Sequence, residues 1–194
     1  MKKRKIWIVV IAISLIAGLG FWFTTTNAYK LAKGYYLYKT NKVIVSHKKV
    51  ETDKLYPTRP KIGDEIGQLE IPKLKSTLPI YHGSDEDELE KGVGHYAKSV
   101  LPGENDNTVL SGHRDTVFRR LGEIKIGDQL IIQTSAGKFT YKVKKTKIVD
   151  KNDRTIIVPK PRATLTVSTC YPFNYIGSAP KRYILIANLI KSET

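Results

Sequence analysis

Three side chains in this sequence are of types that cooperate in thiol chemistry: Cys170, His113 and Arg182. A thiolate is a nucleophile, and a neighbouring imidazole can take the proton of the thiol and later protonate a departing amine. A guanidinium, which is charged at any relevant pH, can stabilise the oxyanion of a tetrahedral intermediate. If the fold brings the three groups together, they could transfer an acyl group through a thioester.

Each of these residues stands at the end of an expected β-strand. Residues 164–169 alternate apolar and polar side chains and lead directly into Cys170, the only cysteine of the chain. Arg182 opens the next expected strand, so if the two strands are antiparallel neighbours, the thiol and the guanidinium share one rim of the sheet. Residues 108–111 form a third expected strand, which ends just before His113 and its preceding glycine. The sequence therefore predicts a site at the ends of three strands.

The other histidines and the arginine beside His113 are interpreted differently. Arg114 is expected to point away from the site, since neighbours on an extended chain alternate between faces. His47, His82 and His95 have no comparable spacing in the sequence, so structural or surface roles are expected for them. One cysteine and scattered histidines also match no zinc spacing, and we expect no bound metal.

The chain after residue 62 has the texture of a mainly β fold. A capping box that opens at Ser84 predicts a short helix, which explains the acidic run 85–90 better than a calcium site does. Residues 116–121 are expected to form a helical turn, and the Gly-containing loop 135–137 a hairpin. Many short strands with few helices favour a closed or nearly closed β-barrel. The further strands are expected at residues 65–71, 78–81, 129–134, 138–149 and 182–189.

The N-terminal residues predict a membrane anchor. Residues 2–5 are all basic, and residues 6–23 form an 18-residue run without a charge. Eighteen helical residues span about 27 Å, close to the hydrocarbon thickness of a bilayer. The positive-inside rule places the basic cluster in the cytoplasm and the rest of the chain outside. A cleaved signal peptide is the alternative, although residues 26–28 are a poor cleavage site.

The organisation that follows is a cytoplasmic tail at 1–5, a transmembrane anchor at 6–23, a stalk at 24–61 and a catalytic domain at 62–191. The formal net charge of +15 suits an anionic leaflet or cell wall, or simply a solvated lysine-rich surface. Nucleic acid is not an expected partner outside a membrane. A lone cysteine in an oxidising compartment is a liability unless its reactivity is used, which favours a functional thiol.

The segments that carry the three side chains resemble those of the sortase family. Residues 166–170 (Thr-Val-Ser-Thr-Cys) resemble the Thr-Leu-x-Thr-Cys signature of the family, with Val167 as the one departure. Residues 110–118 resemble the histidine segment of sortases, and residues 182–187 resemble their arginine strand. The short form, without a long lid segment before the barrel, is most similar to class D sortases and unlike the pilus-polymerising class C.

The resemblance implies a sortase β-barrel of about eight strands. It implies that Cys170 attacks the carbonyl after Thr in a Leu-Pro-x-Thr-Gly-like or Leu-Pro-x-Thr-Ala-like sorting signal of a secreted protein, with the thiolate–imidazolium pair as the minor active form. His113 and Arg182 would complete the catalytic set. An amine of peptidoglycan or of its lipid-linked precursor would then resolve the thioester. No cofactor is implied, although some sortases are stimulated by Ca²⁺.

Four residues near the strand ends are expected to contact the substrate: Ser111, Thr169, Tyr171 and Phe173. The last two belong to the aromatic loop 171–176, which could form one wall of an apolar peptide groove. Two other enzymes remain alternatives, a cysteine peptidase and an L,D-transpeptidase, although the latter family places Gly before its cysteine and Arg two residues after it. A basic, membrane-tethered wall-binding module is the non-enzymatic alternative, and it would not need the thiol.

Overall fold

The computed structural model describes residues 19, 20, 22, 24 and 25, which are helical, and residues 55–174 and 179–194. The chain divides into two compact units, residues 1–50 and 51–194. The predicted tail and most of the predicted anchor and stalk lie outside the described residues. Within the described part of the chain, no helix is both long and apolar enough to span a bilayer.

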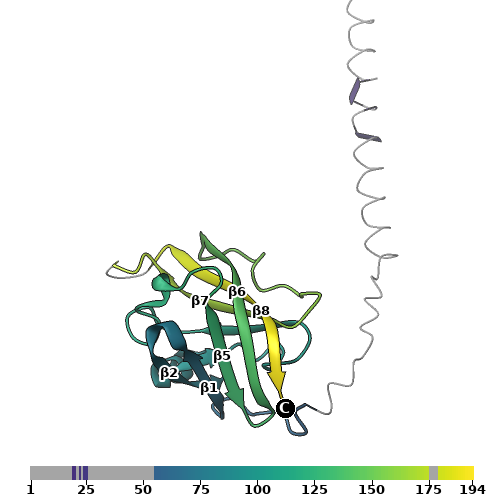
Figure 1. Cartoon of the computed structure of the whole chain (residues 1–194). Coiled ribbons are helices and arrows are strands. Elements are labelled where there is room, and N and C mark those ends of the chain that lie inside the picture. Colours follow the sequence, from purple (N-terminus) through teal and green to yellow (C-terminus); the bar gives the residue numbers. More distant parts are fainter. Residues whose placement is uncertain (1–18, 21, 23, 26–54, 175–178) are drawn as a thin grey trace, which may run out of the picture. The chain divides into compact units, whose positions relative to one another are not determined.

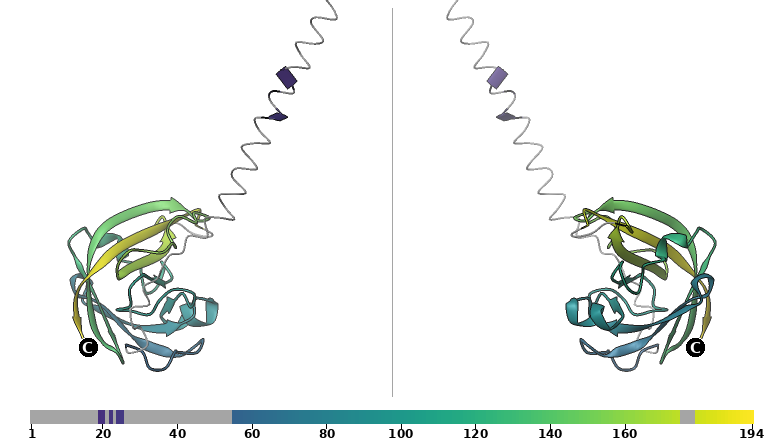
Figure 2. Two further views of the ribbon diagram at one scale, coloured as in Figure 1. Left: turned by 90° about the vertical axis from the view of Figure 1, so that its right-hand side faces the viewer. Right: turned by 90° about the vertical axis from the view of Figure 1, so that its left-hand side faces the viewer.

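The second unit is a closed barrel of eight strands, which Figures 1 and 2 show from three sides. The order around the barrel is β1-β2-β3-β4-β7-β8-β6-β5. Most neighbours are antiparallel, whereas β2 with β3 and β4 with β7 are parallel pairs. The mainly β barrel expected from the sequence is thus confirmed. The strands are β1 (Glu65–Ile71), β2 (Ser76–His82), β3 (Val93–His95), β4 (Asn107–Ser111), β5 (Gln129–Thr134), β6 (Gly137–Asp150), β7 (Thr164–Tyr171) and β8 (Lys181–Glu193).

The short helices differ in detail from the expected ones. Helix α2 (Glu86–Lys91) begins after Asp85, which is its N-cap in place of Ser84. The expected helical turn at 116–121 is a series of turns, followed by the 3₁₀ helix η3 (Leu121–Glu123). A second 3₁₀ helix, η2 (Pro72–Leu74), joins β1 to β2. Strand β3 was not expected, because three residues are too few to show the alternation that predicts a strand.

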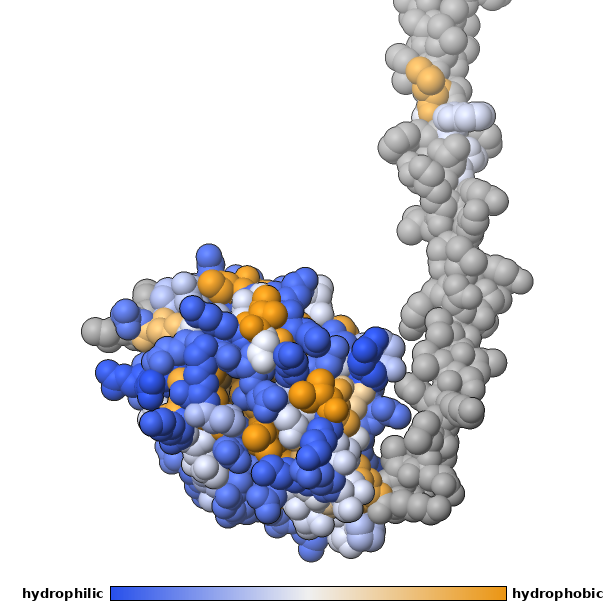
Figure 3. All heavy atoms as spheres, viewed as in Figure 1, coloured by the Kyte–Doolittle hydropathy of each residue, from blue (hydrophilic) through white to orange (hydrophobic). Residues whose placement is uncertain are grey.

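Apolar side chains from every strand fill the barrel. Full burial of one such side chain stabilises the fold by about 1.5 to 3 kcal/mol. Along β7 the odd-numbered residues face this core, so the even-numbered ones face outward. Figure 3 shows one face of the outer surface, which is mainly hydrophilic with scattered apolar side chains. Fully buried core residues include Leu69, Ile71, Ile80, Leu110, Leu130, Ile132, Phe139, Tyr141, Leu165, Val167 and Leu185.

The segment between β6 and β7 covers the outer face of the parallel pair β4 and β7. Asn107 fixes it there, because its Nδ2 donates hydrogen bonds to the carbonyl oxygens of Ile156 and Val158. The Asn107 Oδ1 in turn accepts a 2.7 Å hydrogen bond from the Thr166 hydroxyl. This cover ends before the last residues of β7, which leaves the strand end accessible beside it.

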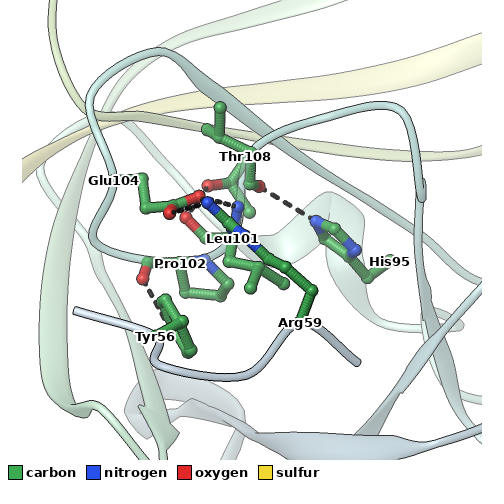
Figure 4. A network of polar contacts seen from close by, with 8 residues as sticks. Tyr56, Arg59, His95, Leu101, Pro102, Glu104 and Thr108 are labelled. Carbon is green, nitrogen blue, oxygen red and sulfur yellow. Dashed lines mark hydrogen bonds and ion pairs between the residues drawn. The ribbon is translucent and has the colours of Figure 1, made fainter. Parts of the chain in front are cut away.

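Residues 55–61, assigned from the sequence to the stalk, pack against the barrel (Figure 4). The Tyr56 hydroxyl donates a 2.7 Å hydrogen bond to the Pro102 carbonyl, and the Arg59 guanidinium lies 2.7 Å from the buried carboxylate of Glu104. One carboxylate oxygen of Glu104 makes no hydrogen bond, and the ion pair with Arg59 compensates its charge. The barrel unit therefore begins several residues earlier than the sequence predicts.

Candidate active site

Cys170 and Arg182 lie directly opposite each other on neighbouring strands. Strands β7 and β8 are antiparallel, and their register pairs Cys170 with Arg182. Directly opposed residues of an antiparallel pair project from the same face of the sheet, so both side chains lie on the outer face of the barrel. The Cys170 side chain is half-buried. Arg182 Nη1 donates to the carbonyl oxygens of Ala179 and Lys181 at 3.2 and 3.0 Å, which holds the guanidinium at this rim.

His113 reaches the same rim from β4. Strands β4 and β7 are parallel, with Ser111 opposite Ser168, so both strands end on the same side. The backbone after β4 is tied to β7 twice: Gly112 N donates to Ser168 O at 3.3 Å, and the Thr169 hydroxyl donates to Gly112 O at 2.8 Å. The convergence of the three strand ends, which sequence alone could not establish, is thereby confirmed.

Gly112 is required by the close packing beside His113. A Cβ atom at this position would lie 2.6 Å from ring carbons of Phe118, which is almost completely buried. The chain then turns, and His113 O accepts a hydrogen bond from Phe118 N at 3.0 Å. The glycine and the turn together fix the direction in which the histidine leaves β4.

A sequence model described as the sortase domain matches residues 69–190, which span all three strand ends. The chain belongs to the sortase family. Sortase D of Bacillus subtilis is 57% identical over 128 residues, which are 66% of this chain and 65% of that protein. Sortase SrtE1 of Streptomyces coelicolor is 30% identical over 57% of this chain and 37% of its own length. The chain thus spans less than two thirds of the length of these curated relatives.

Solved sortase structures share the fold. A Clostridium perfringens Sortase D5 transpeptidase has a TM-score of 0.62 and 30% identity, over 69% of this chain and 83% of that chain. The catalytic domain of Bacillus anthracis SrtD has a TM-score of 0.60 and 45% identity, over 70% and 93% of the two chains. The expected similarity to class D sortases is confirmed by these relatives.

Arg114 of this sortase does not point away from the site, and the expectation that it would is wrong. Because the chain turns after Gly112, the alternation of an extended strand does not apply. The Arg114 guanidinium is buried and donates a 2.9 Å hydrogen bond to Pro172 O, two residues after Cys170. Hydrogen bonds to the Asp115 carboxylate, the charge of that group and the proximity of Cys170 all raise the pKa of Arg114. A second arginine therefore lies near the thiol, in addition to Arg182 on the opposite strand.

Of the four residues expected to contact the substrate, Thr169 is buried on the wrong face of the strand, and the expectation for it is wrong. Its side chain is 3% exposed, on the core side of β7, and its hydroxyl is bonded to Gly112 O. Thr169 therefore supports the backbone that carries His113, and it lies on the opposite face of the strand from Cys170. Ser111, in contrast, is half-buried at the end of β4, next to the rim that carries Cys170.

Tyr171 and Phe173 form an aromatic cluster with Tyr183 at the ends of β7 and β8. Like Thr169, Tyr171 and Tyr183 lie on the core-side face of these strands, opposite the face that carries Cys170. The ring centroids of Phe173 and Tyr183 are 5.2 Å apart, and those of Tyr171 and Phe173 are 5.7 Å apart. The cluster lines an open pocket of about 410 Å³, to which Arg119 and Ile148 also contribute. Contact with the substrate remains a prediction for these residues. Residues 175–176 of the expected aromatic loop lie outside the described residues.

His82 and His95 have structural roles, as expected. Burial lowers the pKa of His95 to about 4, so its ring is neutral near pH 7. His95 Nε2 lies 2.9 Å from the Val100 carbonyl and therefore carries a proton, which leaves Nδ1 to accept from His82 Nδ1 at 3.0 Å. His47 lies outside the described residues. In the described part of the chain, no group of three His, Cys, Asp or Glu side chains could hold a metal ion.

Proposed function

We propose that this sortase is a membrane-anchored cysteine transpeptidase. It cleaves a Leu-Pro-x-Thr-Gly-like or Leu-Pro-x-Thr-Ala-like sorting signal after Thr and joins the protein to an amine of peptidoglycan or of its lipid-linked precursor. The observation that carries the proposal is the register that sets Cys170 opposite Arg182, with His113 at the end of the adjacent parallel strand. Family membership and a relative described as a transpeptidase support it.

The reaction divides into two acyl transfers. The Cys170 sulfur attacks the carbonyl carbon of Thr, the Thr–Gly or Thr–Ala amide bond breaks, and the thiol proton passes through His113 to the departing amine. The acceptor amine then attacks the thioester and gives its proton to His113, and the thiol is regenerated. Arg182 stabilises the oxyanion of each tetrahedral intermediate, a contribution of about 3 to 4 kcal/mol for a well-placed donor.

The end of the outer face of β4 and β7, which the segment between β6 and β7 leaves accessible, is the proposed binding place of the peptide. It leads directly to Cys170. Ser111 lies near its catalytic end. An extended peptide on this face would present its Thr carbonyl to the thiol at the strand end.

Residues 6–23 are proposed to anchor the enzyme with its barrel outside the membrane, where secreted proteins and lipid-linked precursors both pass. Tethering to the same surface raises the effective concentration of enzyme and substrates without any new contact. The full chain should fractionate with membranes, and a variant without residues 1–28 should be released. Equal recovery of both proteins in the soluble fraction would contradict the anchor.

The reaction is tested with a small set of sorting-signal peptides and candidate amines, followed by mass spectrometry of enzyme and products. A thioester on Cys170 and a ligated peptide are expected, with neither formed by Cys170→Ala. Cleavage that yields only the hydrolysed peptide at every amine concentration would indicate a cysteine peptidase. Peptide binding that is unchanged in Cys170→Ala, without cleavage by the wild type, would indicate a binding module.

A further inference from the structure

His113 makes one ion pair with a residue that the sequence did not associate with the site. Glu86 is the first residue of α2, and its Oε1 lies 3.3 Å from His113 Nε2. The two side chains are 72% and 35% exposed, respectively. Glu86 makes no other ion pair or side-chain hydrogen bond with the described residues, so its carboxylate is committed to the histidine.

The start of α2 is held firmly against the barrel. A capping box closes its first turn, with Asp85 N donating to the Glu88 carboxylate at 3.2 Å. Two glycines allow the helix to approach the strands closely: a Cβ on Gly83 would lie 2.7 Å from the Glu88 carboxyl carbon, and one on Gly94 would lie 2.9 Å from a Leu89 methyl. The position of Glu86 relative to the end of β4 is therefore set by packing.

Of the other charged groups around His113, the carboxylate is already paired with an arginine, and the remaining group is a cation. On its own loop, the Asp115 carboxylate is bonded to the Arg114 guanidinium at 3.0 Å, and this bond lowers the pKa of Asp115. From β8, Arg182 adds a second cation at the rim, opposite Cys170. Glu86 is thus the carboxylate from a separate element that faces the imidazole without being neutralised by an arginine.

We propose that Glu86 is a positioning residue for His113. The carboxylate orients the ring at the rim and stabilises the imidazolium that forms each time the histidine carries the thiol or amine proton. The inference rests on the proposed function, because the imidazolium matters only if His113 transfers protons. Since the pair is largely exposed, its effect is modest, about a 2- to 5-fold contribution to turnover.

The test compares Glu86→Gln with Asp87→Asn in the peptide ligation reaction. Both changes remove one carboxylate from the first turn of α2, but Asp87 has no contact with His113. Glu86→Gln is expected to lower kcat about 2- to 5-fold with the peptide KM unchanged, whereas Asp87→Asn stays at the wild-type value. Glu86→Asp should recover part of the loss, and all variants should melt near the wild-type temperature.

Three results would overturn the inference: wild-type kcat in Glu86→Gln, an equal loss in Asp87→Asn, or a change confined to KM. If the wild type ligates no peptide, the proposed function fails, and the pair is then tested without substrate. The rate at which iodoacetamide alkylates Cys170 reports the thiolate that the imidazolium stabilises. Glu86→Gln should slow alkylation by a similar factor relative to Asp87→Asn, and equal rates would again reject the role of Glu86.

Discussion

At the scale of single residues, the site depends on the direction in which each side chain leaves its strand. Cys170 and Arg182 share a face because they are directly opposed in an antiparallel pair. Thr169, one residue earlier, points into the barrel and cannot serve the same purpose. A shift of one position along β7 therefore separates the proposed nucleophile from a side chain that supports the backbone.

Arg182→Lys tests whether the guanidinium fork is needed. Lys keeps the charge but has no planar pair of donors, and loss of one oxyanion donor costs about 100-fold in kcat. We expect a loss of this order in steady-state ligation, with the peptide KM little changed. Cys170→Ala and His113→Ala should abolish transfer altogether.

The matched control for Arg182 is Lys181→Gln. This change removes a neighbouring positive charge that is exposed and opposite Tyr171, not Cys170. Lys181→Gln should keep near-normal activity, because Arg182 is proposed to donate hydrogen bonds to the oxyanion and not merely to add a positive charge. Near-normal turnover by Arg182→Ala would remove Arg182 from the mechanism.

At the scale of elements, periodicity predicts the strands but not how their ends are joined. The alternation in residues 164–169 indicates β7 and its thiol, and adjacency along the chain suggests that β8 lies beside it. The parallel pairing of β4 with β7 is a long-range contact that no local pattern encodes. The direction of the Arg114 side chain was wrongly predicted for a related reason, because it depends on a turn that packs against Phe118.

Thr169→Val tests the hydroxyl that joins β7 to the loop carrying His113. The change leaves Gly112 O without its partner, which should cost about 1 to 2 kcal/mol in the free energy of unfolding. Because the loop is released at the position next to His113, kcat in peptide ligation should fall several-fold as well.

The control is Thr166→Val, which removes another buried hydroxyl from the same strand. Its partner is Asn107, far from the histidine along β4, so a similar loss of stability with wild-type kcat is expected. Urea unfolding and ligation kinetics measure the two effects separately. An unchanged kcat in Thr169→Val would show that the hydroxyl supports only the fold.

At the scale of the whole barrel unit, a network of polar side chains away from the rim that carries Cys170 connects the first described residues of the unit to the strands. His95 lies at one side of it (Figure 4), with its ring stacked on His82 at a centroid distance of 5.1 Å. Arg59 and Glu104 form the neighbouring ion pair, which Figure 4 shows beside His95. Because this network holds several segments against the barrel, its protonation state should affect global stability more than chemistry.

The unit should lose stability in acid through His95. Burial, the largest cause, lowers the pKa of His95 to about 4, although the hydrogen bond to Val100 and the charge of Glu104 raise it. In the unfolded chain the pKa of a histidine is near 6.5. Between about pH 6.5 and pH 4, the unfolded state therefore binds a proton on His95, whereas the folded state does not. The stability that neutral His95 contributes is fully present above about pH 6.5 and is lost as the pH falls to about 4. The change is about 3 kcal/mol in the free energy of unfolding.

Urea unfolding at pH 7.5 and 4.5 measures this change. His95→Gln keeps a donor for the Val100 carbonyl but cannot titrate, so it should be less stable at pH 7.5 and show a flatter pH dependence. An equally steep dependence in that variant would assign the acid sensitivity to other groups.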